Sequence, residues 1–387
     1  MDIKKMIDNE KLVNWRRHFH MYPEVSFKEH ESTKYIVAQL EQYPGLEISR
    51  PTETGVVAVL KGGLPGKTVG LRADFDALPI TEEADVEFRS KNPGAMHACG
   101  HDCHAAMLLG AVDVLYKIKD KLPGTVKFIF QHAEELPPGG AIELVKSGVL
   151  DDVDVFYGSH VNSDTPVGVI RSGVGPMYAH TDRFEITIMG KGCHAASPHK
   201  GIDSLLVGLE VVQALNYIVS RNVPASETAV LTVGAFNAGT VANVVPDTAN
   251  IKGTVRTYNS EVRDMIVERI KDLTGGICKA YGATHTIEFV QGYAAVVNDE
   301  NLCKLFNEVA LDTFPGIKIE QMTPIMGGED FSAFRAIAPS IFSGVGARCE
   351  DGEVYPGHHP KYQISEGCLP IGCALYIAFA LKAGASQ

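Results

Sequence analysis

The residues best suited to chemistry lie in one short stretch, 96–104, with the sequence MHACGHDCH. Six of its nine residues are histidine, cysteine or aspartate, which ligate metals or transfer protons. Cys99 and His101 are two positions apart, so both can reach one ion from a loop, with Gly100 allowing the backbone to turn. The alternative is a buried cluster of structural histidines, a less common use of such short spacing. The stretch therefore predicts a metal site.

Glu134 and Glu135 are the second signal. They follow an apolar segment, 125–130, and precede the Pro/Gly-rich residues 136–139, which places them at the edge of a sheet rather than on a helix. Adjacent acidic residues more often lie on a solvated surface, which is the alternative interpretation. At a sheet edge, neighbouring side chains point in different directions. One carboxylate can then bind a metal while the other accepts a proton from water.

Further histidines follow other elements. His160 ends a strand predicted over 154–158, and His358 and His359 lie in a Gly/Pro-rich loop. Each of them alone is as well explained by a structural role. Together with Cys99, His101 and Glu135, however, His160 and one of the two C-terminal histidines give five candidate ligands. Five protein ligands are too many for one catalytic zinc, which keeps about three plus water, but suit two ions.

The elements that must position these residues alternate along the chain. In the first half, apolar strands alternate with helices, and acidic residues and histidines follow the strands, as at the ligand crevice of a doubly wound sheet. Asp102 is the expected N-cap of the helix that follows the metal-binding stretch. The helices are predicted at 9–20, 28–42, 104–119 and 139–147, and the strands at 56–61, 68–73, 125–130 and 154–158.

The pattern changes near residue 180. The order becomes β-α-β-β-α-β, which is ferredoxin-like, and strand-helix alternation resumes near residue 300. We therefore predict an α/β catalytic domain with a mostly parallel sheet, 1–179 and 293–387, interrupted by an α+β domain, 180–292. The inserted elements are expected at 182–189, 201–220, 228–236, 248–257, 259–281 and 284–290, and the later ones at 299–312, 340–345 and 366–382.

Composition excludes some classes of function. The 387 residues carry a formal net charge of −12, which argues against a nucleic-acid partner, because such binding requires a basic surface. The charged N-terminus lacks the apolar core of a signal peptide. The longest apolar run, 371–381, is about half a membrane span, so no membrane partner is expected. Eight scattered cysteines show no disulfide-framework spacing, and a cytoplasmic location is predicted.

The inserted domain carries its own polar cluster. Residues 190–199, GKGCHAASPH, include His194, and Asn243 and Arg256 lie around a later strand. A glycine-rich turn that happens to hold histidines explains the first group equally well. Arg256 could pair with a substrate carboxylate, although a surface arginine on a strand is the simpler interpretation of this residue alone.

Taken together, these motifs resemble the aminoacylase/carboxypeptidase family of di-metal amidohydrolases. The closest subgroup contains hippurate hydrolases, N-acyl-amino-acid amidohydrolases and auxin-conjugate hydrolases. The similarity covers essentially the whole chain in matching order and implies a catalytic domain interrupted by a lid or dimerisation domain. The matching segments are 71–80 (LRADFDALPI), 96–104, Glu134-Glu135, 192–199 and 243–247.

The resemblance also implies roles for individual residues. Glu134 would be the general base and then the proton donor to the leaving amine, and Asp76 would support the site. His194 of the lid would polarise the scissile carbonyl, across a subunit interface in dimeric relatives. Asn243 and Arg256 would hold the substrate. The implied ligands of two divalent ions are Cys99, His101, Glu135, His160 and His358.

Three positions depart from the subgroup's usual pattern, which has proline at His132, alanine at Cys103, and serine or asparagine at His359. His132 and Cys103 place extra potential ligands beside the site. His359 makes the C-terminal ligand ambiguous by one position, and we choose His358 because it stands before the X-Pro pair. The ligand set fits zinc or manganese, with nickel and cobalt also compatible.

The predicted function is metal-dependent hydrolysis of N-acyl amino acids, either hippurate-like or N-acetyl, in a homodimer or larger homo-oligomer formed through the lid. A dipeptidase or carboxypeptidase using the same site is the nearest alternative. A non-catalytic binding protein of the same fold and a purely structural metal site are the others. The acyl group and the amino acid are not determined by the sequence.

Overall fold

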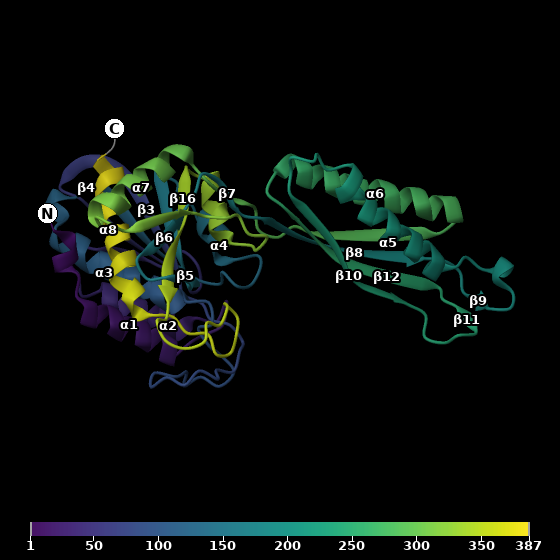
Figure 1. Ribbon diagram of the computed structural model, residues 1–387, viewed down its shortest axis with the longest axis horizontal. Helices are drawn as coiled ribbons and strands as arrows, with labels where there is room; N and C mark the ends of the chain where they lie inside the picture. Colours follow the sequence, from purple (N-terminus) through teal and green to yellow (C-terminus); the bar gives the residue numbers. More distant parts are fainter. Residues whose placement is uncertain (1, 386–387) are drawn as a thin grey trace. The chain divides into compact units, whose positions relative to one another are not determined.

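A computed structural model describes residues 2–385 of the chain, which forms two compact units (Figure 1). Unit 1 comprises Met1–Met177, Val296–Thr323 and Asp330–Gln387. Unit 2 comprises Tyr178–Ala295 and the short segment Pro324–Glu329. The inserted domain was predicted at 180–292, without residues 324–329.

Unit 1 is built on an eight-stranded sheet with the order β1-β2-β4-β3-β5-β16-β6-β15. Strands β4, β3, β5 and β16 run parallel to one another in its centre. The run Val126 to Phe130 in β4 is buried throughout, as expected for a strand covered on both faces. The predicted α/β class with a mostly parallel sheet is thus confirmed. The strands are β1 Glu47–Ser49, β2 Val56–Lys61, β3 Leu64–Asp74, β4 Pro123–Gln131, β5 Val155–Pro166, β6 Val169–Ser172, β15 Lys318–Gln321 and β16 Ser340–Arg348.

Two helices of unit 1, α3 and α8, are largely buried beside this sheet. α3 and α8 pack against each other and both contact β3 (Figure 1). In the described part of the chain, one helical segment, Glu366–Ala385, is long and apolar enough to cross a membrane, but 67% of its most apolar window is buried inside the protein. Such burial is typical of the core helix of a soluble protein. The helices are α1 Asn9–Met21, α2 His30–Leu40, α3 His101–Lys117, α4 Gly140–Lys146, α7 Glu300–Thr313 and α8 Leu369–Ala385.

The start of α3 differs from the prediction. The helix begins at His101, and its N-cap is Gly100 with φ of 97°, a left-handed conformation that glycine adopts without strain. A Cβ atom at this glycine would lie 2.3 Å from Cγ2 of Val161. The expected N-cap, Asp102, is instead buried inside the first turn, where its Oδ2 accepts a hydrogen bond from Arg16 Nε at 2.8 Å. The prediction of Asp102 as the cap was therefore wrong, because its carboxylate accepts a hydrogen bond from Arg16, which is distant in the sequence.

β5 is much longer than the predicted 154–158, and His160 lies within it rather than after it. The extension pairs with β16 as far as Pro166. The residues of this extension are mostly polar, although alternate ones are buried. The polar composition did not indicate a strand, and the pairing with β16 stabilises it.

Unit 2 has the predicted ferredoxin-like order. Its four strands are all antiparallel, in the order β10-β12-β8-β13. α5 and α6 contact each other and this sheet (Figure 1). The side chains of Asp203 and Asn259 cap their N-termini, as short polar side chains do. The elements are β8 His180–Met189, α5 Ser204–Arg221, β10 Ala229–Ala238, β12 Thr248–Thr257, α6 Ser260–Tyr281 and β13 Thr284–Val290.

Two small sheets complete the description. β9 pairs with β11, and β7 pairs with β14. These short strands were not predicted, because two to four residues carry too little periodicity to be recognised. They are β7 Gly175–Tyr178, β9 Cys193–His194, β11 Val244–Val245 and β14 Val296–Asn298.

Candidate metal centre

Five candidate ligands from distant parts of the sequence converge within unit 1. The parallel arrangement of β3, β4 and β5 brings their carboxyl ends to one edge of the sheet. The register pairs Arg72 with Gly158, so His160, two residues further along β5, is level with the end of β3. The five residues are Cys99 before α3, His101 in its first turn, Glu135 after β4, His160 in β5 and His358 in the loop after β16.

The donor atoms form two overlapping sets. Cys99, His101 and His160 each place a donor atom within 4.8 Å of the others, and so do Cys99, Glu135 and His358. Cys99 Sγ lies 3.3 Å from His160 Nε2, and Glu135 Oε1 lies 3.2 Å from His358 Nε2. Cys99 thus belongs to both sets, which is an arrangement that suits two neighbouring cations.

The chemistry of the cluster fits a cation. His101 Nε2 is buried and makes no hydrogen bond to any residue in the described range 2–385. Burial raises the pKa of the Cys99 thiol, with the nearby Glu135 carboxylate acting in the same direction. The close approach of Cys99 and then Glu135 raises the pKa of His358 to about 10. A thiol, a carboxylate and an imidazole therefore lie close together in surroundings that favour a positive charge.

Asp76 connects two of the candidate ligands. His101 Nδ1 lies 3.1 Å from both the backbone oxygen and Oδ1 of Asp76, which directs Nε2 of the same ring away from this carboxylate. Oδ2 accepts hydrogen bonds from Ser26 Oγ at 2.6 Å and from the backbone N–H of Glu135 at 3.0 Å. Burial disfavours the charged carboxylate, but these hydrogen bonds, led by that of His101, lower the pKa of Asp76 overall. Asp76 therefore fixes the orientation of an imidazole and the position of a carboxylate.

Glu134 lies beside the candidate ligands. The residue is 7% exposed, and a carboxylate oxygen of Glu134 lies within 4.8 Å of donor atoms of His101 and Glu135. The preceding residue, Ala133, has φ of 50°. This turn directs the two successive glutamates to different positions in the centre.

A buried network of charged residues that was not predicted from the sequence adjoins the centre. Asp74 Oδ1 lies 2.5 Å from His104 Nδ1, and Asp74 Oδ2 lies 2.9 Å from Arg72 Nη1. His104 Nε2 accepts a hydrogen bond from the backbone N–H of Val161, next to His160, at 2.9 Å. Burial opposes ionisation of Asp74, but Arg72 and then the two histidines His101 and His104 lower its pKa well below the ordinary value. Asp74 lies in the segment 71–80 that carries part of the family resemblance, but its partners are known only from the tertiary structure.

The three additional candidates are not part of the cluster. His132 Nε2 lies 3.0 Å from Glu143 Oε2, and Cys103 is fully buried in α3. His359 stacks on Tyr355 with ring centroids 4.5 Å apart. Among the described residues, none of the groups that could hold a metal includes any of these three. His358 rather than His359 approaches Cys99 and Glu135.

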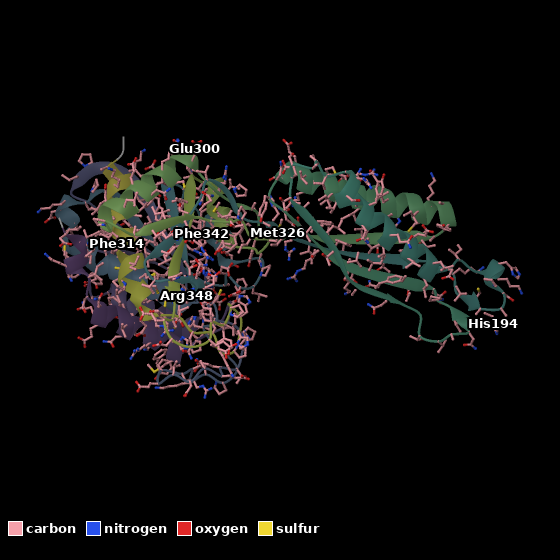
Figure 2. All side chains as sticks on the ribbon, in the orientation of Figure 1. His194, Glu300, Phe314, Met326, Phe342 and Arg348 are labelled. Atoms are coloured by element: carbon pink, nitrogen blue, oxygen red, sulfur yellow. The ribbon has the colours of Figure 1, made fainter. Side chains whose placement is uncertain are left out.

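The remaining predicted site residues belong to unit 2. His194 in β9 is exposed and pairs with Val244 of β11, and Figure 2 shows it at the end of unit 2 that carries these strands. Asn243 is its neighbour, since its backbone oxygen accepts from Ala195 N–H at 3.1 Å. Arg256 lies eight residues along β12 from Thr248, about 27 Å at the usual rise of a strand. Its guanidinium donates to the backbone oxygen of Asp182. Unit 2 therefore brings His194 and Asn243 together and separates Arg256 from them.

Comparison with known proteins gives a consistent picture. A family model described as Peptidase family M20/M25/M40 matches residues 70–382. The chain is similar to an N-acyl-L-amino acid amidohydrolase of Geobacillus stearothermophilus, with 47% identity over 77% of this chain and 81% of that protein. It is also similar to thermostable carboxypeptidase 1 of Saccharolobus solfataricus, with 35% identity over 99% of both chains. The Bacillus subtilis YXEP protein, described as a dinuclear metal binding peptidase, matches in structure with a TM-score of 0.86 and 34% identity, over 98% of this chain and 99% of that one.

Proposed function

The chain belongs to peptidase family M20/M25/M40, and from that premise we propose that it is a metal-dependent amidohydrolase of N-acyl amino acids. It would hydrolyse the amide bond to give a carboxylate and a free amino acid. The observation that carries the proposal is the pair of donor sets sharing Cys99, with the Glu134 carboxylate beside them. The similarity to an N-acyl-L-amino acid amidohydrolase supports the choice of substrate class.

Two divalent ions are proposed for this centre. Cys99, His101 and His160 would hold one ion, and Cys99, Glu135 and His358 the other, as their grouping suggests. Thiolate, imidazole and carboxylate donors together fit zinc or manganese, and nickel or cobalt are compatible with the same set. The similarity to a dinuclear metal binding peptidase supports the number of ions.

When bound, the ions would supply Lewis-acid polarisation of the carbonyl and a lowered pKa of water. The remaining chemistry belongs to side chains of this chain. Glu134 would accept the proton of the attacking water and later deliver it to the departing nitrogen. Asp76 would keep His101 and Glu135 in position through its hydrogen bonds. His194 would donate a hydrogen bond to the carbonyl oxygen as negative charge develops on it. His194 and Asn243 would reach the substrate from one subunit of the proposed oligomer, and Arg256, which is far from both along β12, would hold the substrate from another.

The nearest alternative is a dipeptidase or carboxypeptidase with the same catalytic residues. The similarity to a carboxypeptidase over nearly the whole chain supports this alternative. The two activities differ in one feature of the substrate, because a dipeptide carries a free α-amine that an N-acyl amino acid lacks.

Removal and return of the metal tests the proposal. The purified protein is stripped with a chelator, reloaded with zinc or manganese, and assayed for amine release from N-acetyl, N-benzoyl and glycyl amino acids. We expect the stripped protein to be folded and inactive, and the reloaded protein to cleave the N-acyl substrates. Cleavage of the glycyl substrates alone would establish a dipeptidase. Unfolding on chelation, or no activity with two metals bound, would contradict the proposal in favour of a structural site or a binding protein.

A homodimer or larger homo-oligomer formed through unit 2 is also proposed. Three apolar residues of α5 are exposed, Leu206 by 56%, Leu209 by 44% and Tyr217 by 56%. The neighbouring strand β10 is an edge of its sheet, pairing only with β12 among the described strands. An exposed apolar helix face beside an open strand edge favours association.

The eight cysteines are free thiols, which supports the proposed cytoplasmic location.

The double substitution Leu206→Glu and Leu209→Glu tests this surface. Two like charges on an apolar contact would disrupt it, so we expect a monomer by size-exclusion chromatography with light scattering. The exposure of both side chains means that the fold should be retained. Glu268→Ala and Lys271→Ala in α6, at two residues whose side chains are exposed, serve together as the control and should leave the oligomer intact. A monomeric wild-type protein would contradict the proposal.

A further inference from the structure

The backbone conformation at Ala133 is unusual for the place it occupies. Ala133 has φ of 50°, in the left-handed region that residues with a Cβ atom seldom adopt. It stands between the end of β4 and the two glutamates of the centre. If this residue relaxed to an ordinary φ, the direction of the chain through Glu134 and Glu135 would change. Something must therefore hold the turn.

A buried carboxylate from another part of the chain makes that contact. Glu29, which immediately precedes α2, is 0% exposed. Its Oε1 accepts a hydrogen bond from the backbone N–H of Ala133 at 2.8 Å, and its Oε2 accepts one from Thr54 Oγ1 at 3.0 Å. Thr33 Oγ1 lies 2.6 Å from the backbone oxygens of both Glu29 and Thr54, which joins the two segments that carry these groups. The carboxylate is thus fixed on both sides.

The backbone on the other side of Glu134 is anchored in the same way. The N–H of Glu135 donates to Asp76 Oδ2 at 3.0 Å. Glu29 and Asp76 therefore hold the backbone N–H groups of the residues that precede and follow Glu134. The turn is closed further by Gly140, whose N–H donates to the backbone oxygen of Ala133 at 3.1 Å.

We propose that Glu29 is a positioning residue for Glu134, which acts by holding the left-handed turn at Ala133 through its hydrogen bond to that backbone N–H. The proposal rests on the assignment of Glu134 as general base in the proposed function. It assigns a role in turnover to a residue outside the metal cluster and outside the recognised motifs.

The environment of Glu29 indicates that this side chain does more than fill space in the core. Burial, followed by the nearby Asp76 carboxylate, raises the pKa of Glu29 to about 7, while the hydrogen bonds from Thr54 and Ala133 act in the opposite direction. An ionisable group kept in such a position weakens the fold relative to an apolar residue. This cost is explained if its two acceptor oxygens are needed to hold Thr54 and the Ala133 turn.

Three variants test the proposal. Glu29→Ala removes the acceptor, whereas Glu29→Gln keeps an oxygen that can accept from Ala133. Asp113→Ala is the matched control, because Asp113 is also a buried carboxylate that accepts hydrogen bonds from several side chains, Lys11, Tyr43 and Lys117, but it lies twelve residues along α3 from His101. For each protein, bound metal, kcat, KM, Tm and hydrogen exchange of a peptide covering 131–140 are measured.

We expect Glu29→Ala to keep its metal and to lose about 10- to 100-fold in kcat, with KM changed by less than about threefold, as for a misplaced catalytic group. Exchange in the 131–140 peptide should rise. In Glu29→Gln, both kcat and the exchange of the 131–140 peptide should lie closer to the wild-type values than in Glu29→Ala. Asp113→Ala should lower Tm without changing kcat or this exchange.

Equal kcat in Glu29→Ala and wild type, or equal exchange in Glu29→Ala and Asp113→Ala, would overturn the proposal. Failure of the proposed function gives a different result. The wild-type protein would then release no amine, while the exchange measurement would still decide whether Glu29 holds the turn.

Discussion

Glu134→Gln is expected to bind metal and fold as the wild-type protein does, but to lose at least about 10³-fold in kcat, the upper part of the range for a general base. The amide that replaces the carboxylate has nearly the same size, so that the turn and the neighbouring ligands stay in place. It cannot accept a proton from water or deliver one to the departing nitrogen. KM should change little, since the substitution affects a proton transfer rather than substrate binding.

Metal content and amine release, measured on the same preparation, check this prediction. Glu143→Gln is the matched control: Glu143 lies close by in α4 and interacts with His132, but its side chain is 43% exposed and is not part of any donor set among the described residues. That variant should retain its activity. Normal turnover by Glu134→Gln at full metal content would remove Glu134 from the mechanism.

Arg72→Met is expected to destabilise unit 1 by about 3–5 kcal/mol, the usual cost of removing one partner of a buried ion pair. Arg72 is 1% exposed. Its guanidinium lies 2.9 Å from a carboxylate oxygen of Asp74 and 2.9 Å from one of Asp330, and it donates to Gln131 Oε1 at 2.7 Å. Methionine occupies a similar volume but leaves two buried carboxylates without their cation.

Unfolding by urea, followed by fluorescence, measures this effect. The chain has a single tryptophan, Trp15 of α1, so the signal reports on unit 1. Arg17→Met is the control, because Arg17 makes a comparable pair with Glu366 at 2.8 Å but its side chain is 40% exposed; removal of such a pair should cost no more than about 1 kcal/mol. If the two variants lose the same free energy of unfolding, the buried network does not stabilise the fold as proposed.

The sequence by itself predicted the features that depend on neighbouring residues. The spacing of Cys99 and His101, the Glu134-Glu135 pair and the change in the order of elements near residue 180 are local patterns. The α/β class and the ferredoxin-like insertion were predicted from the order of the strands and helices, because hydrophobic periodicity indicates secondary structure directly. The candidate ligands could also be proposed from local sequence, because cysteine, histidine and glutamate seldom occur together at such short spacing.

Only the tertiary structure decided which distant groups meet. It places His358 rather than His359 beside Cys99, pairs Asp102 with Arg16 instead of the helix N-terminus, and separates Arg256 from Asn243 by most of the length of β12. It joins Glu29 to Ala133 across 104 positions and Arg72 to Asp330 across 258. Glu29 is one of 47 acidic residues, and no neighbour in the sequence distinguishes it. A buried hydrogen bond is determined by which chain segments pack together, and packing over such separations leaves no periodic trace in a single sequence.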